Sequence, residues 1–262
     1  MIIDTHCHLN DQRYFDDLDE VITRAKEHNV KGVLIPGADP RELPRAVEIC
    51  EQNENIFFSI GVHPYDLEFY NEDELLKYAS HPKCIAVGEC GLDYFRLPKD
   101  EVEKEREKEA QKEIFIAQIK LAKKVQKPLI IHIRDASEDS KKILIEHNAK
   151  EVGGVLHCYN ASPILLELDK HGFYFGIGGV VTFKNAKRLV EILPQIPIEK
   201  LLIETDGPYL TPHPHRGERN EPWYTTFILD RMSEILEIER AKLEKIILNN
   251  TYKIFEEFSK HS

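Results

Sequence analysis

The sequence predicts an α/β protein folded as a single (β/α)8 barrel. Eight short apolar runs rich in β-branched residues recur along the chain, and stretches with helical periodicity separate them. The runs are continuously apolar rather than alternating, which is typical of parallel strands buried on both faces. The length of 262 residues suits such a barrel, which needs about 250. The alternative is an open doubly wound sheet, but no Gly-rich phosphate-binding motif follows any of the runs.

Each expected strand is one of these apolar runs. The first, MIIDT at 1–5, opens the chain, and GVLIP at 32–36 follows the first helical stretch. β-Branched and aliphatic side chains favour the extended conformation because they pack well on a pleated surface. The eight expected strands are 1–5, 32–36, 56–61, 84–89, 129–133, 153–157, 173–178 and 200–204.

The stretches between the strands have the periodicity of amphipathic helices. Residues 16–28 place an apolar stripe from Leu18 to Ala25 on one side. Residues 101–127 predict a long helix whose Lys/Glu-rich first half we interpret as a solvated face. No linker or repeat interrupts the pattern, so one domain is expected over 1–262. The other expected helices are 40–52, 71–79, 136–148, 162–171, 184–193, 222–237 and 239–259.

Composition argues against several classes of protein. The net charge of −11 disfavours a basic, non-specific nucleic-acid-binding surface, although it leaves room for a local phosphate site. The five cysteines form no CxxC pair, which disfavours a zinc ribbon or a disulfide framework. The sequence has no signal-peptide pattern and no apolar run of about 20 residues. We therefore expect a cytoplasmic protein without membrane contact or an obligate protein partner.

Metal-binding side chains gather at the predicted carboxyl ends of the strands. His6 and His8 are two residues apart near the end of the first strand, so both imidazoles point to the same face. In a barrel, the carboxyl ends of the strands form the catalytic face. A buried carboxylate without a cation is costly, so His and carboxylate residues converging there predict a metal site. The six candidate ligands are His6, His8, Glu89, His132, His157 and Asp206.

Six ligands exceed the needs of one tetrahedral ion. Two divalent ions about 3.5–4 Å apart, bridged by a carboxylate, account for them better. Glu89, midway around the barrel, is the expected bridge. A mixed set of imidazole and carboxylate ligands suits several divalent metals. We expect two ions of Mg, Mn or Zn, and the residues do not decide between these metals.

Other polar residues on the same face are candidate substrate contacts, and most have a structural alternative. His63, after the third strand, is expected to contact substrate. Arg134 is expected to grip phosphate, with an ion pair to a nearby carboxylate as the alternative. Arg216 and Arg219 lie in the loop after the last strand, where barrels often hold phosphate. Tyr94 either stacks on a base or packs under its own loop.

Six segments surround these candidates: DTHCH (4–8), GVHP (61–64), GECGLDYF (88–95), IIHIRDA (130–136), GVLHCY (154–159) and ETDGPYLTPHPHRGERNEP (204–222). Together they resemble the motifs of the TatD-like metal-dependent hydrolases, a branch of the amidohydrolase-type barrels that includes the TatD deoxyribonucleases. The resemblance spans nearly the whole chain. Small departures, such as Gly207 where Ala or Ser is common, adjoin the candidate ligands rather than replace them.

The resemblance implies a metal-dependent hydrolase barrel with a dinuclear site. It assigns one ion to His6, His8, Glu89 and Asp206, and the other to Glu89, His132 and His157. It also implies hydrolysis of DNA phosphodiester bonds, often as a 3′→5′ exonuclease, with single strands or 3′ ends as substrate. In the expected mechanism Asp206 accepts the proton of a metal-activated water, while His63 positions the substrate or protonates the leaving oxygen.

Three alternatives remain open at this point. The first is a D-aminoacyl-tRNA deacylase, and the second is an amidohydrolase or phosphotriesterase-like hydrolase of a small substrate. Dinuclear amidohydrolases commonly bridge their metals with a carbamylated Lys, and no Lys occurs between Cys84 and Leu97. The third alternative is a metal-binding scaffold without catalysis, which the arginine-bearing loops disfavour.

Overall fold

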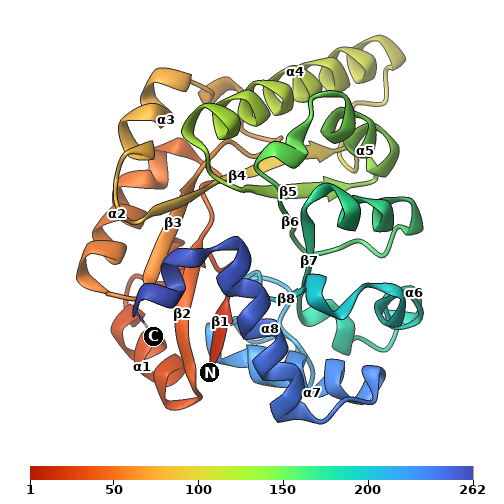
Figure 1. Ribbon diagram of the computed structural model, residues 1–262. Helices are drawn as coiled ribbons and strands as arrows, with labels where there is room; N and C mark the ends of the chain where they lie inside the picture. The colour runs from red at the N-terminus through yellow and green to blue at the C-terminus, as the bar shows by residue number, and fades with distance from the viewer. Residues whose placement is uncertain (262) are drawn as a thin grey trace.

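A single sheet of eight parallel strands forms the centre of the structure, a computed structural model that describes residues 1–261. The strands follow one another around the sheet in chain order, and helices lie outside them (Figure 1). This confirms the predicted (β/α)8 barrel. The strands are β1 (Ile2–Asp4), β2 (Val30–Ile35), β3 (Ile56–Ile60), β4 (Cys84–Asp93), β5 (Leu129–Arg134), β6 (Gly154–Leu156), β7 (Phe173–Ile177) and β8 (Leu201–Ile203).

The barrel closes through the segments that follow β1 and β8. The Thr5 amide donates to the Ile203 carbonyl at 3.1 Å, and the Asp206 amide donates to the His6 carbonyl at 2.8 Å. The buried Asp4 carboxylate accepts from the Thr205 amide at 2.9 Å and from the Thr205 hydroxyl at 2.5 Å. The closing seam therefore joins two of the segments that carry candidate ligands.

The helices occupy the predicted stretches, but parts of several stretches are 3₁₀ turns or end early. Residues 163–171 form a 3₁₀ helix rather than an α-helix, α6 is shorter than expected, and the last helix ends at Ile254 before a 3₁₀ segment over Glu256–His261. No helix within the described chain is long and apolar enough to cross a membrane. The helices are α1 (Leu18–Glu27), α2 (Leu43–Gln52), α3 (Glu72–Ala79), α4 (Glu101–Val125), α5 (Ser137–Glu146), α6 (Lys187–Ile192), α7 (Thr225–Leu236) and α8 (Arg240–Ile254).

Every strand contributes to an apolar layer, which Phe255 and Phe258 complete from the C-terminal segment. Ile130 and Val155 belong to this layer. Because side chains alternate along a strand, His132 and His157, each two residues further on, share the inward direction of Ile130 and Val155. The same alternation that builds the core therefore turns these two imidazoles toward the barrel axis at its carboxyl end.

Candidate metal centre

Glu89 lies at the centre of the predicted site. One carboxylate oxygen, Oε1, lies 2.8 Å from His132 Nδ1 and 3.2 Å from His157 Nε2. The other, Oε2, lies 3.2 Å from His6 Nε2 and 3.7 Å from His8 Nε2. Burial opposes ionisation, but contacts with His157 and the other histidines hold the pKa of Glu89 well below its usual value. Glu89 is thus an ionised carboxylate with imidazole nitrogens around both oxygens.

Gly88 positions Glu89. Its φ of +143° is one that L side chains rarely adopt, and a Cβ at this position would lie 2.3 Å from the Ile130 carbonyl oxygen. The backbone of β4 can therefore approach β5 this closely only with glycine before Glu89. The close approach brings Glu89 within reach of His132 on the neighbouring strand.

Asp206 completes the predicted set from the segment after β8. Its Oδ1 lies 3.7 Å from the Nε2 atoms of both His6 and His8. The backbone at Asp206 has a φ of +59°, a left-handed conformation that Asp tolerates better than most residues. Burial would raise the pKa of Asp206, but contacts with His8 and His157 lower it. All six predicted residues therefore converge. They fall in three triads of candidate ligands: His6, His8 and Asp206; His6, Glu89 and His157; and His63, Asp93 and His132.

The His6 ring tests whether this set suits a metal ion. Both ring nitrogens are buried, and neither has a hydrogen-bond partner. An unsatisfied buried polar group is costly unless something else supplies a partner. Burial lowers the pKa of His6, so the ring is neutral and Nε2 can offer a lone pair. A divalent cation among the nearby carboxylate oxygens would satisfy it, so the residues fit a metal.

Two carboxylates for which the sequence predicted no role contact His132 and His157, at the ring nitrogens that face away from Glu89. Asp93 Oδ2 lies 2.9 Å from His132 Nε2, and Glu204 Oε1 lies 3.2 Å from His157 Nδ1. Such partners fix the tautomer of a ligating histidine and raise its basicity. Asp93 and Glu204 lie in GECGLDYF and ETDGP, segments that also contain the candidate ligands Glu89 and Asp206. A further carboxylate close to a candidate ligand was the sequence signal that could have identified them.

His63 faces the same cluster with a defined tautomer. Its Nδ1 accepts from the Tyr65 amide at 3.1 Å, and its Nε2 lies 3.7 Å from Glu89 Oε1. Burial lowers the pKa of His63 to about 4, so the ring is neutral near pH 7. A neutral ring that accepts at Nδ1 carries its proton on Nε2. His63 is therefore a hydrogen-bond donor toward the cluster.

The candidate substrate contacts divide into two groups. Within the described chain Arg134 has free donors, whereas the polar groups of Tyr94, Arg216 and Arg219 already bond to other residues of the chain. Arg134 stacks on Phe95 at 3.6 Å and forms no ion pair within residues 1–261, so its donors are free. Tyr94 donates to Asp139 at 2.7 Å, which favours its structural alternative. Arg216 donates to the Thr211 carbonyl at 2.9 Å and stacks on Phe183.

Arg219 departs most from the expected phosphate contact. Its Nη1 and Nη2 each lie 2.7 Å from an oxygen of Asp17, and Nη2 also donates to Glu221 at 2.8 Å. Nη1 further donates to the Arg13 carbonyl. These four hydrogen bonds occupy the guanidinium, so Arg219 joins the last loop to the start of α1 rather than presenting donors to a ligand.

Two cavities open at the cluster, and five residues line both: His132, Arg134, His157, Asp206 and Tyr209. The first cavity, about 430 Å³, lies toward β1–β4 and includes His8, His63 and Glu89. The second, about 570 Å³, lies toward β5–β8 and α6. Both volumes fall within the range of about 300–1,000 Å³ typical of small-ligand sites.

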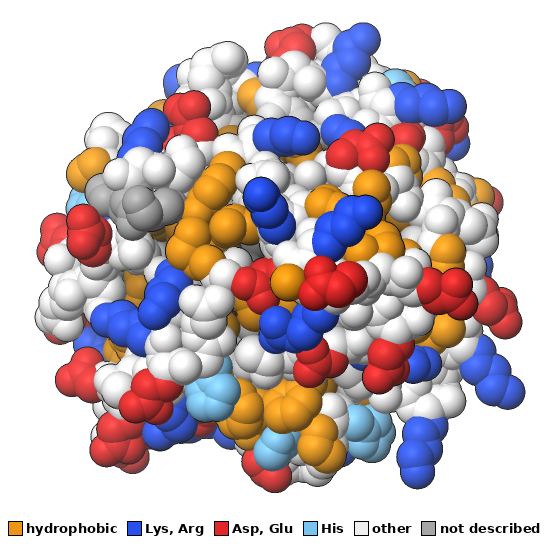
Figure 2. Space-filling view, turned by 60° about the horizontal axis from the view of Figure 1, so that its bottom comes forward, with side chains coloured by type: hydrophobic (Ala, Val, Ile, Leu, Met, Phe, Trp, Pro, Cys, Tyr) orange, Lys and Arg blue, Asp and Glu red, His pale blue; other side chains and the backbone are white. Residues whose placement is uncertain are grey.

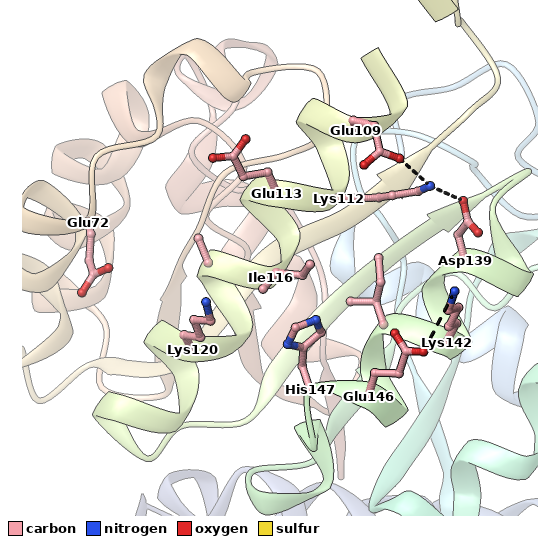
Figure 3. Close-up of a pocket in the computed structure, with 12 residues that line it drawn as sticks. Glu72, Glu109, Lys112, Glu113, Ile116, Lys120, Asp139, Lys142, Glu146 and His147 are labelled. Atoms are coloured by element: carbon pink, nitrogen blue, oxygen red, sulfur yellow. Dashed lines mark hydrogen bonds and ion pairs between the residues drawn. The ribbon is translucent and has the colours of Figure 1, made fainter. Parts of the chain in front are cut away.

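A larger cavity of about 780 Å³ lies outside the barrel, between α4 and α5 (Figure 3). Lys112 extends from α4 toward Asp139 on α5 and pairs with it at 3.1 Å, while it also pairs with Glu109 at 3.0 Å. On α5, Lys142 pairs with Glu146. The charged side chains that line this outer cavity therefore largely neutralise one another, and none of the candidate metal-binding groups lies there.

The chain is similar to known proteins over nearly its whole length. Residues 3–256 match the family described as TatD related DNase. YabD of Bacillus subtilis (strain 168), named an uncharacterized metal-dependent hydrolase, is 43% identical over 97% of this chain and 99% of its own. The 3′-5′ ssDNA/RNA exonuclease TatD of Escherichia fergusonii is 35% identical over 89% of this chain and 90% of its own. The crystal structure of YjjV, a TatD homolog from Escherichia coli K12, is 27% identical, with a TM-score of 0.88 over 97% of this chain and 98% of that chain.

Proposed function

The chain belongs to the TatD-related DNase family of metal-dependent hydrolases, and from that premise we propose that it is a 3′→5′ exonuclease acting on single-stranded DNA. The observation that carries the proposal is the convergence of four histidines and two carboxylates, Glu89 and Asp206, with both His6 nitrogens buried and without a hydrogen bond. The name of the relative from Escherichia fergusonii supports a single-stranded polynucleotide substrate.

The proposed cofactor is a pair of divalent ions, Mg, Mn or Zn. His6, His8, Glu89 and Asp206 would hold one ion, and Glu89, His132 and His157 the other. When bound, such ions lower the pKa of a water molecule and polarise a phosphoryl group. The two oxygens of Glu89 support this division, because Oε2 faces His6 and His8 whereas Oε1 faces His132 and His157.

Three side chains of this protein have proposed roles in the reaction. Asp206 is ionised at neutral pH because its pKa is lowered, so it can accept a proton from the attacking water. His63 donates from Nε2 to an oxygen of the scissile phosphate or to the leaving oxygen. Arg134, with free donors at the junction of both cavities, binds a phosphate oxygen.

Because the molecule as a whole is acidic, phosphate has to be attracted by positive charges at the site itself. The net charge is −11, and acidic and basic side chains are interspersed on the face shown in Figure 2. A broad basic surface is therefore not what would bring a polynucleotide to this protein. All five cysteines are unpaired, which supports our proposal of a cytoplasmic location.

The test is a panel of divalent metals with labelled single-stranded and double-stranded DNA, a D-aminoacyl-tRNA and a p-nitrophenyl phosphodiester. We expect stepwise shortening of single strands from the 3′ end that requires metal. Asp206→Asn should lower kcat by about 10³-fold or more if Asp206 is the general base. Cleavage of single-stranded DNA at the wild-type rate by this variant would overturn the role of Asp206, and deacylation without nuclease activity would overturn the proposed substrate.

Asp135→Asn is the matched control. Asp135 also has a left-handed backbone, with a φ of +53°, but it is exposed and lies outside the triads of candidate ligands. The same chemical change in the same backbone conformation should leave activity unaltered. A similar loss in both variants would indicate a general disturbance of the catalytic face.

A further inference from the structure

The two cavities at the metal centre differ in charge. Beyond the shared residues, the cavity toward β1–β4 is lined by six further carboxylates: Asp11, Asp39, Glu42, Asp66, Glu89 and Asp93. Arg13 and Arg41 neutralise Asp11 and Asp39, but neither Glu42 nor Asp66 forms an ion pair within the described chain. Besides Arg134, Arg96 is the one guanidinium in its lining among the described residues. This cavity is therefore unfavourable to the phosphates of a polynucleotide.

The cavity toward β5–β8 has the opposite character. Asp206 is the only carboxylate in its lining, whereas Arg134 and Arg188 both contribute to it. Neither guanidinium forms an ion pair with any residue in 1–261, although most arginines of this chain do. The cavity thus combines unneutralised positive charge with direct access to His132, His157 and Asp206.

Asn185 and Arg188 present their polar groups beside this cavity without partners. They lie three residues apart around the start of α6, both are exposed, and neither side chain forms a hydrogen bond with the described chain. Asn160, on the opposite wall, is already bonded to Ser137 and to the Ser162 amide. Asn185 and Arg188 therefore supply the free donors that a bound molecule would meet.

The remaining wall is apolar and aromatic. Val180, Leu189 and Leu210 line it, and the ring of Tyr209 stands where the two cavities meet, 47% exposed. Apolar walls with a few convergent polar groups are typical of sites for small organic ligands. A flat nucleobase has this combination of an apolar face and a hydrogen-bonding edge, and Arg and Asn are side chains that commonly bind base edges.

We propose that the β5–β8 cavity holds the 3′-terminal nucleotide of a single-stranded substrate, with Arg188 and Asn185 binding its base or sugar and Arg134 binding the phosphate on its 5′ side. This assignment rests on the proposed function and adds a direction to it. The terminal nucleotide lies toward α6, and the scissile phosphate lies between the two cavities, at His132, His157 and Asp206. The rest of the strand leaves across the mouth of the barrel.

The experiment compares metal-loaded wild type with Arg188→Glu, Asn185→Ala and the control Lys187→Glu. Lys187 is the exposed neighbour of Arg188 on α6 and does not line the cavity. Two quantities are measured for each protein. One is kcat and KM on a 5′-labelled single-stranded oligonucleotide, and the other is the inhibition constant of deoxyadenosine 5′-monophosphate against hydrolysis of bis(p-nitrophenyl) phosphate. Thermal melting confirms that the exposed substitutions leave the fold intact.

We expect Arg188→Glu to raise both KM and the inhibition constant about tenfold or more, the effect of losing one charge-assisted hydrogen bond. The value of kcat should change much less, because Arg188 belongs to none of the triads of candidate ligands. Asn185→Ala should shift both constants in the same direction by a smaller factor. Lys187→Glu should match wild type, because the overall charge change is the same but the side chain lies outside the cavity.

The outcomes separate this assignment from the proposed function. Wild-type values of KM and of the inhibition constant in Arg188→Glu, with normal cleavage of DNA, overturn the nucleotide cavity and leave the nuclease proposal standing. If wild type cleaves no polynucleotide but the mononucleotide inhibits in a manner that depends on Arg188, the nuclease proposal fails and the cavity is upheld. If wild type shows no cleavage of a polynucleotide and no inhibition by the mononucleotide, both proposals are overturned.

Discussion

Asp93 and His132 form a directed pair at the metal centre. Asp93 Oδ2 lies 2.9 Å from His132 Nε2, while the other nitrogen of the same ring, Nδ1, lies 2.8 Å from Glu89 Oε1. The second oxygen of Asp93 accepts from the Tyr65 hydroxyl at 2.5 Å and from the Phe95 amide at 2.9 Å. Because an ionised carboxylate only accepts, Asp93 holds a proton on Nε2. If a metal binds between His132 and Glu89, the ring then offers it the lone pair of Nδ1.

Asp93→Asn should therefore weaken metal binding by reversing the tautomer of His132. The amide oxygen of the substituted side chain would stay where two donors point, at Tyr65 and Phe95, and its NH₂ group would face His132 Nε2. That nitrogen must then accept, which moves the proton to Nδ1 and blocks the candidate ligand atom. We expect metal affinity to fall by about 10–100-fold, measured by competition with a chelator of known affinity.

Tyr65→Phe is the control for this substitution. It removes one donor to Asp93, but the Phe95 amide still bonds the same oxygen and the contact with His132 is unchanged. Its metal affinity should remain within about threefold of wild type. Equal losses in Tyr65→Phe and Asp93→Asn would show that the tautomer of His132 does not control binding.

His63→Leu should lower kcat without changing the shape of the pH profile. Burial holds the pKa of His63 at about 4, so the ring is already neutral above about pH 5 and acts through its Nε2 proton rather than through titration. Loss of one such donor typically costs about 10²–10³-fold in kcat. The measurement is kcat between about pH 5.5 and pH 8 for both proteins. Disappearance of an ionisation near pH 6.5 in the variant would instead identify His63 as a titrating general acid.

Removal of the metal should weaken the binding of single-stranded DNA. Without metal, the ionised carboxylate of Asp206 lines both cavities, that of Glu89 lines the cavity toward β1–β4, and the chain carries a net charge of −11. We expect fluorescence anisotropy to show affinity at least about tenfold weaker after dialysis against a chelator, with recovery when Mn²⁺ is restored. Equally tight binding by metal-free protein would assign the attraction to arginines alone.

The positions of the candidate ligands followed from sequence because they depend on local alternation and on strand ends. His132 and His157 are two residues beyond core residues of their own strands, so the pattern that predicts a buried strand also fixes their direction. The contact of Asp93 with His132 depends on how β4 pairs with β5 after a register shift between Val87 and Cys90. Residue spacing does not contain that shift, and Asp93 was therefore missed.

The roles of the arginines likewise depend on tertiary contacts that residue spacing does not predict. Arg134 and Arg219 look alike in sequence, since both come after expected strands, at 129–133 and 200–204. They differ because Asp17, 202 residues before Arg219 in the chain, folds against it and occupies its donors. Arg188 lies in a helix whose sequence has no metal or phosphate motif, and only the packing of α6 beside the barrel mouth reveals that it lines a cavity.

Arg219→Gln should destabilise the fold at neutral pH and have little effect on substrate binding. Contacts with Arg219 lower the pKa of Asp17; burial opposes the ionised form of Glu221, but Arg24 and Arg219 lower its pKa as well. Carboxyls with a depressed folded-state pKa stabilise the protein above their unfolded pKa of about 4 and lose that contribution as pH falls through the folded value. We expect a loss of about 1–3 kcal/mol in unfolding free energy at pH 7, narrowing as pH falls below about 4. Urea denaturation at several pH values measures it.

The control is Arg231→Gln, which removes an exposed pair with Glu234 on α7. An exposed pair of this kind contributes less than about 0.5 kcal/mol, so its loss should be small and nearly independent of pH. Arg219→Gln should keep a KM for single-stranded DNA close to wild type, because Asp17 and Glu221 already hold the guanidinium. A large rise in KM with unchanged stability would reverse this assignment and place Arg219 among the phosphate contacts.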